Sequence, residues 1–279
     1  EQRDFPWRRT RDPWSVLVSE VMLQQTQAHR VAERFGAFMR RFPTAAAMAA
    51  GSDAEVLAAW SGLGYNRRAV ALRRAAIMVD QHGWPHDVAG LQDLPGIGPY
   101  TARAVAALAF GRPVGAVDTN VRRWLVRRLG MARDASSSSL QAVADALAAD
   151  APDADQAAAW MHASMEFGAA VCRARNPDCE ACPVADGCPS RGRGVAVPVA
   201  RQPTFAGSAR EARGLLLKAL ASAPEHRLPM AEVASIVSDV DLDRLLPGLE
   251  RDGLAHRSDD LVCLGGRESD GGAVATIGT

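Results

Sequence analysis

The chain has 279 residues, of which 48% are hydrophobic and 23% charged; these values are typical of a globular protein and exclude wholesale disorder. Polar or charged residues interrupt every apolar stretch well before 18 residues, so no membrane span is expected, and the N-terminal residues lack the pattern of a secretory signal. The 32 basic and 32 acidic residues cancel, yet residues 1–130 contain 18 arginines against 11 acidic residues. This basic first half suggests a polyanionic partner.

Residues 14–170 have mostly helical patterns. An apolar helical run covers residues 14–23, after Asp12 and Pro13, which can start a helix. The serines at 136–139 are interpreted as a loop. Apolar residues at three- and four-residue spacing predict further helices over residues 28–41, 53–60, 66–82, 100–110, 118–129 and 139–149. No alternating strand pattern is convincing before residue 200, so an all-α body is predicted.

A linker and a small second module follow this body. Residues 191–208 turn to Gly, Pro and Val, as in an inter-domain linker. Short helices are then predicted over 208–222, 229–237 and 240–252, followed by hairpin strands at 254–257 and 261–264, which is a winged-helix pattern. The third helix is acidic, which argues against a role in reading a DNA groove; packing or a protein contact is the alternative. Residues 266–279 are predicted to be a disordered tail.

Residues 94–102, with the sequence LPGIGPYTA, fall between two predicted helices. Gly96 and Gly98 permit positive φ angles and close backbone approach, and the helix that follows begins with free N–H groups. Such a turn can bind a DNA phosphate, with Thr101 beside it. The alternative is an ordinary Gly-containing turn. The motif resembles the hairpin of helix–hairpin–helix DNA-binding proteins.

Asp118 follows a Gly- and Pro-containing loop, residues 111–117. Taken alone, an Asp at a helix start is most simply an N-cap. Together with the hairpin, however, it resembles the helix–hairpin–helix, Gly/Pro, Asp superfamily of DNA base-excision glycosylases. That resemblance implies that Asp118 lies beside the sugar of an extruded nucleotide, where a carboxylate stabilises or captures a cationic sugar. It also implies supporting roles for Tyr100 and Asn120.

Glu20 lies inside an almost wholly apolar helix. Burial raises the pKa of a carboxyl group, and a carboxylic acid still protonated near neutral pH can act as a general acid. A surface Glu is the alternative. Residues 19–27, SEVMLQQTQ, closely resemble the signature of the MutY family of adenine DNA glycosylases. This resemblance implies that Glu20 protonates adenine and that Gln24, Gln25 and Thr26 contact the opened duplex.

Residues 62–65, Gly-Leu-Gly-Tyr, resemble the wedge loop of the same family. The resemblance implies that Tyr65 inserts next to the base opposite the substrate, where stacking stabilises the flipped state. Asn66 stands where the family often has a second Tyr, which puts some opposite-base contacts in question. A buried core tyrosine is the alternative reading of Tyr65.

Tyr100 occupies the hairpin position at which the related endonuclease III has a lysine. Lys218 is the one lysine of the chain, so residues 1–217 offer no lysine amine for Schiff-base chemistry. A monofunctional glycosylase, without strong lyase activity at the abasic site, is therefore expected. Thymine and uracil mismatch glycosylases of the superfamily can also carry Tyr here, so adenine is favoured by the context of Glu20 and the two glutamines instead.

Four of the five cysteines, Cys172, Cys179, Cys182 and Cys188, lie within seventeen residues. Without a secretory signal this spacing indicates a metal or iron–sulfur site in a reducing compartment. The spacing matches the superfamily loop that holds a 4Fe–4S cluster; structural zinc is the alternative, although only one close pair is present. Glu166, shortly before this loop, stands where the family has a Glu that supports the catalytic Asp, and a surface Glu is the alternative.

These observations predict an all-α helix–hairpin–helix glycosylase fold with a small winged-helix-like domain. The resemblance, which covers about residues 5–200, implies a six-helix barrel at 24–132, an iron–sulfur cluster domain at 1–23 and 133–200, and the winged-helix-like domain at 208–265. The expected function is removal of adenine mispaired with 8-oxoguanine or guanine in duplex DNA, by a monomer in the bacterial cytoplasm at the nucleoid.

Two alternatives stay open. One is a glycosylase for a mismatched or damaged pyrimidine. The other is a cluster protein that binds lesions without cutting, although such a protein has no need of Glu20 and Asp118. Adenine glycosylases of this family typically add a Nudix-like domain that recognises 8-oxoguanine, and the C-terminal residues here have a winged-helix pattern instead, so adenine excision is better supported than the opposite-base preference.

Overall fold

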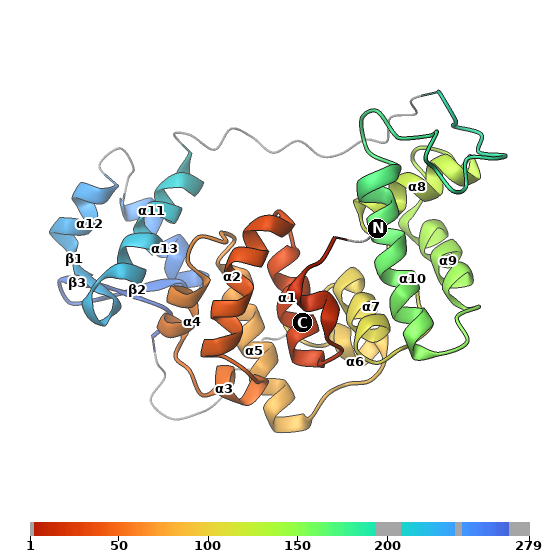
Figure 1. The fold of residues 1–279 in the computed structure, drawn as a ribbon. Coiled ribbons are helices and arrows are strands. Elements are labelled where there is room, and N and C mark those ends of the chain that lie inside the picture. Colours follow the sequence, from red (N-terminus) through yellow and green to blue (C-terminus); the bar gives the residue numbers. More distant parts are fainter. Residues whose placement is uncertain (1–2, 194–207, 238–241, 268–279) are drawn as a thin grey trace. The chain divides into compact units, whose positions relative to one another are not determined.

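The computed structural model describes residues 3–193, 208–237 and 242–267 (Figure 1). These residues are mostly helical, which confirms the predicted all-α body, and within them no helix is long and apolar enough to cross a bilayer. The chain forms two compact units, one from residues 1–36 and 81–202 and the other from residues 37–80 and 203–279. The domain boundaries proposed from the sequence stay a prediction, and most of the linker and of the C-terminal tail lie outside the described residues.

The first unit contains the helices on which the predicted catalytic residues lie. In chain order they are η1 (Pro6–Arg9), α1 (Pro13–Leu23), the first part of α2 (Ala28–Arg41), α6 (Val88–Gln92), α7 (Pro99–Leu108), α8 (Thr119–Leu129), α9 (Ser137–Ala148), α10 (Ala154–Glu166) and the π-helical turn η2 (Phe167–Val171). Helix α7 packs against α1, α6 and α10, and α8 packs against α10 and η2. Residues far apart in the sequence therefore meet around α7.

Local signals explain where these helices begin and end. The Asp12 side chain accepts a hydrogen bond from the Ser15 nitrogen and Pro13 occupies the first turn, so α1 begins as predicted. Helix α8 ends at Gly130, whose φ of 64° is the left-handed C-cap conformation. The predicted serine loop is wrong, because Ser136 caps α9 through the Ser139 nitrogen and the helix already includes the three serines that follow.

Apolar side chains of the first unit fix the relative positions of α8 and α9. Leu125 and Leu140 are fully buried in one cluster with Val121 and Trp124. Before α8, Gly115 lies so close to α9 that a Cβ there would be 2.5 Å from the Ala144 carbonyl group. The loop that leads to Asp118 therefore packs directly against α9, and only glycine fits at position 115.

The second unit combines α3 (Ala45–Ala49), α4 (Asp53–Trp60) and α5 (Arg67–His82) with the C-terminal module, residues 208–237 and 242–267. The elements of this module are α11 (Ala209–Ser222), η3 (Pro224–His226), β1 (Arg227–Pro229), α12 (Met230–Ile236), α13 (Leu242–Arg251), β2 (Ala255–Ser258) and β3 (Leu261–Leu264). The antiparallel sheet has the order β1-β3-β2, with Val262 opposite Leu228 and Arg257. Three helices and the predicted hairpin are thus present, and the three-residue β1 is an addition that alternation could not reveal.

Candidate active site

Glu20 is buried within α1, with 4% of its surface exposed among Leu17, Val21 and other apolar residues. The pKa of its carboxyl group is raised to about 7, chiefly by burial and to a smaller extent by the nearby carboxylate of Asp118. A hydrogen bond with Tyr100 and the positive charge of Arg8 act in the opposite direction. Glu20 therefore holds its proton near neutral pH, and the surface alternative is wrong.

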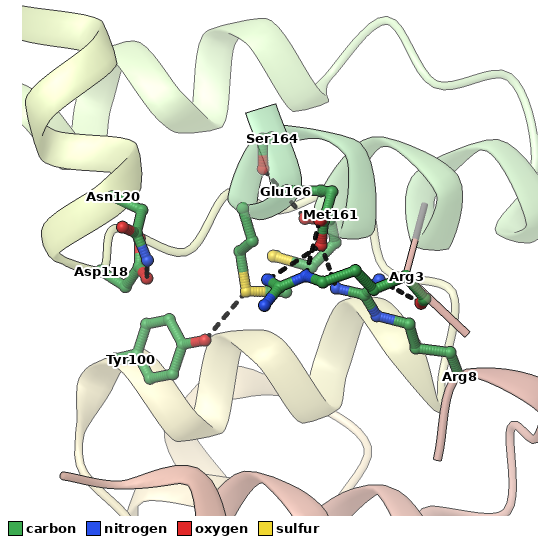
Figure 2. Close-up of polar contacts among 9 residues, drawn as sticks. Arg3, Arg8, Tyr100, Asp118, Asn120, Met161, Ser164 and Glu166 are labelled. Carbon is green, nitrogen blue, oxygen red and sulfur yellow. Dashed lines mark hydrogen bonds and ion pairs between the residues drawn. The ribbon is translucent and has the colours of Figure 1, made fainter. Parts of the chain in front are cut away.

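Tyr100 enters the site from the first turn of α7, directly after the hairpin. Its hydroxyl donates a hydrogen bond to the Met165 sulfur at 3.0 Å, between α7 and α10. The dashed line from Tyr100 in Figure 2 marks this bond. Burial and the neighbouring Glu20 and Asp118 carboxyl groups raise the pKa of Tyr100 well above its ordinary value. The phenol therefore stays neutral and can serve as a hydrogen-bond donor.

Asp118 is the N-cap of α8. One of its carboxylate oxygens accepts a hydrogen bond from the Val121 nitrogen at 2.6 Å. The other accepts one from the side-chain amide of Asn120 at 2.8 Å, and Figure 2 shows these two side chains together. These bonds favour the charged form, but burial outweighs them and raises the pKa of Asp118. The interpretation of Asp118 as an N-cap is therefore correct. It is compatible with the predicted catalytic role, because the same carboxylate that caps α8 also raises the pKa of Glu20.

Arg123 holds the amide of Asn120 in place. Its guanidinium donates to the Asn120 side-chain oxygen at 2.8 Å and, from Nε, to the carbonyl oxygen of Cys172 at 2.8 Å. It also donates to the carbonyl oxygen of Gly168. A Cβ on Gly168 would lie 2.6 Å from the Asn120 carbonyl oxygen, so this position has room only for glycine. A continuous set of hydrogen bonds therefore runs from the first cysteine of the loop to Asp118.

Arg123 and Met165 were missed from the sequence. Arg123 follows Asn120 by three residues on one helix face, which is a signal that could have found it. Met165 is 65 residues from Tyr100 and no local pattern indicates their contact.

Glu166 is buried, so its interpretation as a surface residue is wrong. Its carboxylate pairs with Arg3 Nε and with Arg8 Nη2, each at 2.8 Å (Figure 2). These two arginines lower the pKa of Glu166 in spite of its burial, so the residue is charged at neutral pH. The ion pairs fasten the N-terminal segment to the end of α10.

The predicted DNA-contacting residues of the first unit form two groups, one at the start of α7 and one directly after α1. Gly96 has the expected positive φ of 77°, whereas Gly98 is the N-cap of α7 with a φ of −83°, so only the first glycine needs its conformational freedom. A Cβ on Gly98 would meet no atom within 4 Å, and the turn is exposed. Thr101 is buried and accepts a hydrogen bond from Gln24 at 3.1 Å.

The segment after α1 presents the predicted Gln-Gln-Thr sequence. Gln25 is exposed and has a φ of 55°, whereas Gln24 and Thr26 are half-buried. The Thr26 hydroxyl donates to the Gln24 carbonyl at 3.4 Å. This turn therefore presents Gln25 to solvent while Gln24 is tied to α7.

In the second unit, the loop between α4 and α5 exposes Tyr65, whose side chain is 42% accessible. The core interpretation of this tyrosine is therefore wrong. Its φ of 48°, and the positive φ values of Gly62 and Gly64, show that the loop follows a sparsely populated backbone conformation.

The four cysteines predicted to hold iron line one common cavity in the first unit, together with Trp124 and Phe167. Arg127 donates to the Cys172 sulfur at 3.6 Å, and the Cys188 sulfur lies 3.6 Å from the Arg127 carbonyl oxygen. Within the described residues, no three His, Cys, Asp or Glu side chains converge closely enough to hold a single metal ion. Four thiols around one apolar-walled cavity with an adjacent arginine fit an iron–sulfur cluster, in which each thiolate binds a different iron. Cys263 lies apart in β3.

Comparison with known proteins agrees with this geometry. Residues 18–149 match the HhH-GPD superfamily of base excision DNA repair proteins, and residues 172–188 match the iron–sulfur binding domain of endonuclease III. An adenine DNA glycosylase of Mycolicibacterium smegmatis is 43% identical over 93% of this chain and 90% of its own length.

Two solved structures share the fold. A thermostable thymine-DNA glycosylase is 30% identical with a TM-score of 0.61, and covers 67% of this chain and 88% of its own. An endonuclease III in a non-covalent complex with DNA is 26% identical with a TM-score of 0.57, and covers 68% of this chain and 87% of its own.

These matches show the class of the protein, which is a helix–hairpin–helix protein of base excision DNA repair with an iron–sulfur loop. The chain belongs to the adenine DNA glycosylase family within that class. The predicted fold, family and 4Fe–4S cofactor are thereby confirmed, and DNA is the macromolecule on which the family acts.

Proposed function

We propose that the protein removes adenine mispaired with 8-oxoguanine or guanine from duplex DNA by hydrolysis of the N-glycosidic bond. Its family membership supports adenine as the base. The observation that carries the chemistry is the pairing of two carboxyl groups, Glu20 with a pKa of about 7 and the nearby Asp118. A carboxyl group that is protonated near neutral pH, close to a second carboxylate, is the arrangement that general-acid cleavage of a glycosidic bond requires.

Glu20 is proposed to donate its proton to the purine ring of an extruded adenine, so that the base leaves as a neutral molecule. Asp118 then stabilises the positive charge that develops on the sugar. The Asn120 amide orients Asp118 through the hydrogen bond described above, and the neutral Tyr100 hydroxyl lies within hydrogen-bonding reach of Glu20. Water completes the hydrolysis and leaves an abasic site.

The product is expected to remain unbroken until alkali is added. No lysine precedes Lys218, and Tyr100 takes the place at which a lysine amine would attack the sugar. The reaction therefore ends with base release, as in a monofunctional glycosylase.

Gln24, Gln25, Thr26, Tyr65 and the Gly96–Gly98 turn are proposed as DNA contacts. The exposed Gly96 and Gly98 before α7 support phosphate binding by the turn, and the exposed Tyr65 supports insertion at a base step. A monomer bound to mismatched duplex DNA, in the cytoplasm at the nucleoid, completes the proposal.

Cys172, Cys179, Cys182 and Cys188 are the residues that would hold the cluster. When bound, it supplies a four-point link across the loop, together with the redox chemistry of iron. The chain's own contribution is to position that loop: Arg127 donates to the carbonyl oxygens of Arg173 and Ala174 at 2.7 and 3.1 Å. Basic residues of the loop then lie on a rigid support.

A pyrimidine glycosylase is the second candidate, favoured by the structural likeness to a thymine-DNA glycosylase. Single-turnover excision on duplexes that carry A opposite 8-oxoguanine, A opposite G, or T, U or 5-hydroxyuracil opposite G separates the two, with and without alkali. Alkali-dependent cleavage at adenine, fastest opposite 8-oxoguanine, is expected. Cleavage only at a pyrimidine would contradict the proposed substrate.

A further inference from the structure

The C-terminal module packs against the helix that leads into the loop of Tyr65. Within the second unit, α11 and β3 contact α4, as can be followed in Figure 1. Gly265, directly after β3, approaches the start of α4 so closely that a Cβ there would lie 3.1 Å from both the Ala54 nitrogen and the Asp53 Cβ. At Gly265 the backbone of the module therefore lies against the start of α4 with no room for a side chain.

The same module also contacts the helix that leaves the loop. Asp252, just after α13, pairs with Arg67, the first residue of α5, at 3.4 Å, and with Arg213 of α11. A Cβ on the neighbouring Gly253 would lie 3.8 Å from the Val70 side chain. The C-terminal module thus contacts both helices that flank the loop, α4 and α5.

The loop itself has a conformation that needs support. Gly62 and Gly64 have φ values of 90° and 73°, which glycine adopts readily, whereas the φ of 48° at Tyr65 is strained and persists only where its surroundings determine it. Trp60 Nε1 and Arg68 Nη2 both donate to the Gly64 carbonyl oxygen, at 3.1 and 3.0 Å. The Arg68 guanidinium also lies 5.3 Å from the centre of the Tyr65 ring. Trp60 ends α4 and Arg68 belongs to the first turn of α5, so the loop depends on the two helices that the module holds.

We propose that the C-terminal module is a brace for the wedge loop: it clamps α4 and α5 so that Tyr65 is held in the conformation that enters the duplex. This inference rests on the proposed role of Tyr65. It gives a function to Asp252, the acidic residue directly after α13, which binds two arginines of the protein itself. A helix that faces DNA phosphates would instead need basic residues. Asp252 is accordingly a positioning residue for base flipping.

Hydrogen–deuterium exchange of the full chain tests the brace without reference to catalysis. Asp252→Asn removes both ion pairs at constant shape, and Asp260→Asn, an exposed aspartate in the β2–β3 turn of the same module, is the matched control. The amides of Leu63, Arg68 and Ala69, which donate to backbone carbonyls around the loop, are expected to exchange about two- to fivefold faster in Asp252→Asn, as suits partly exposed ion pairs. Unchanged exchange in both Asp252→Asn and Gly265→Ala, which forces a Cβ against α4, would overturn the inference.

A double-mutant cycle links the brace to the reaction. On a duplex with A opposite 8-oxoguanine, Asp252→Asn is expected to slow single-turnover excision about two- to fivefold, and to have no further effect in a Tyr65→Ala background. An equal loss in both backgrounds would overturn the brace while leaving the role of Tyr65 intact. A native rate for Tyr65→Ala alone would instead remove the proposed role of Tyr65, and with it this inference. Thermal unfolding verifies that every variant is folded.

Discussion

Replacing Glu20 with Gln removes the proposed proton donor while keeping the shape of the side chain. General-acid catalysis typically contributes 10²–10⁴ in rate, so single-turnover excision of adenine is expected to fall by about that factor, or about 3–5 kcal/mol of transition-state stabilisation. Binding of the mismatched duplex is expected to change little, because Glu20 is buried and the substitution leaves the exposed residues of both turns unchanged.

The same substitution has a predictable effect on stability. The pKa of Glu20 rises from 4.5 to about 7 on folding, so the folded state binds the proton more tightly. Stability from this group is full below pH 4.5 and is lost as the pH rises to about 7, a loss of up to about 3 kcal/mol. Glu20→Gln lacks this loss and is expected to unfold at a higher denaturant concentration than the native chain at pH 8.5, with little difference at pH 4.5.

Excision rates and urea unfolding at both pH values, measured on the same two proteins, check this reasoning. A Glu20→Gln protein that cuts adenine at nearly the native rate would refute the role of Glu20 as the acid. A variant that is less stable than the native chain at pH 8.5 would refute the claim that burial of the charge opposes folding.

Three further predictions follow from the site. Asp118→Asn is expected to lower single-turnover excision by at least about a hundredfold with duplex affinity nearly unchanged in a gel-shift assay, and a native rate would contradict its role at the sugar. Arg123→Gln, which frees the Asn120 amide, is expected to lower the excision rate about tenfold. The control is Arg122→Gln, at a half-buried arginine of α8 that donates to the carbonyl oxygens of Arg133 and Ala135; equal effects of the two changes would argue against the hydrogen-bond path. Cys179→Ser is expected to lose the brown absorbance of the cluster, and a variant with unchanged visible spectrum and iron content would remove this residue from the ligand set.

Helix starts and the catalytic helices could be predicted because their signals are local. Asp12 and Pro13 mark α1, and Asp118 marks α8, through contacts that span only three residues. The burial of Glu20 followed from its apolar neighbours in the same helix. Its pKa value could not be predicted in this way, since it depends on Tyr100 and Asp118, which reach the site from two other helices.

Contacts between distant residues were out of reach of sequence patterns. The pairing of Glu166 with Arg3 joins residues 163 positions apart, and nothing in either segment specifies the other. Helix α10 was also not delimited from the sequence, because its many small residues give a weak apolar periodicity. Because α10 was not delimited, the burial of Glu166 at its end could not be predicted either.

The central claim is that a protonated Glu20 cleaves the bond to adenine, and a pH–rate profile of the native protein tests it most directly. Single-turnover excision from a duplex with A opposite 8-oxoguanine is measured from pH 5.5 to pH 9. With a pKa of about 7, about one half of Glu20 is protonated at pH 7, about one tenth at pH 8 and about one hundredth at pH 9, so the rate should fall about fivefold from pH 7 to pH 8 and about tenfold from pH 8 to pH 9. A rate that stays level or rises from pH 7 to pH 9 would contradict the account.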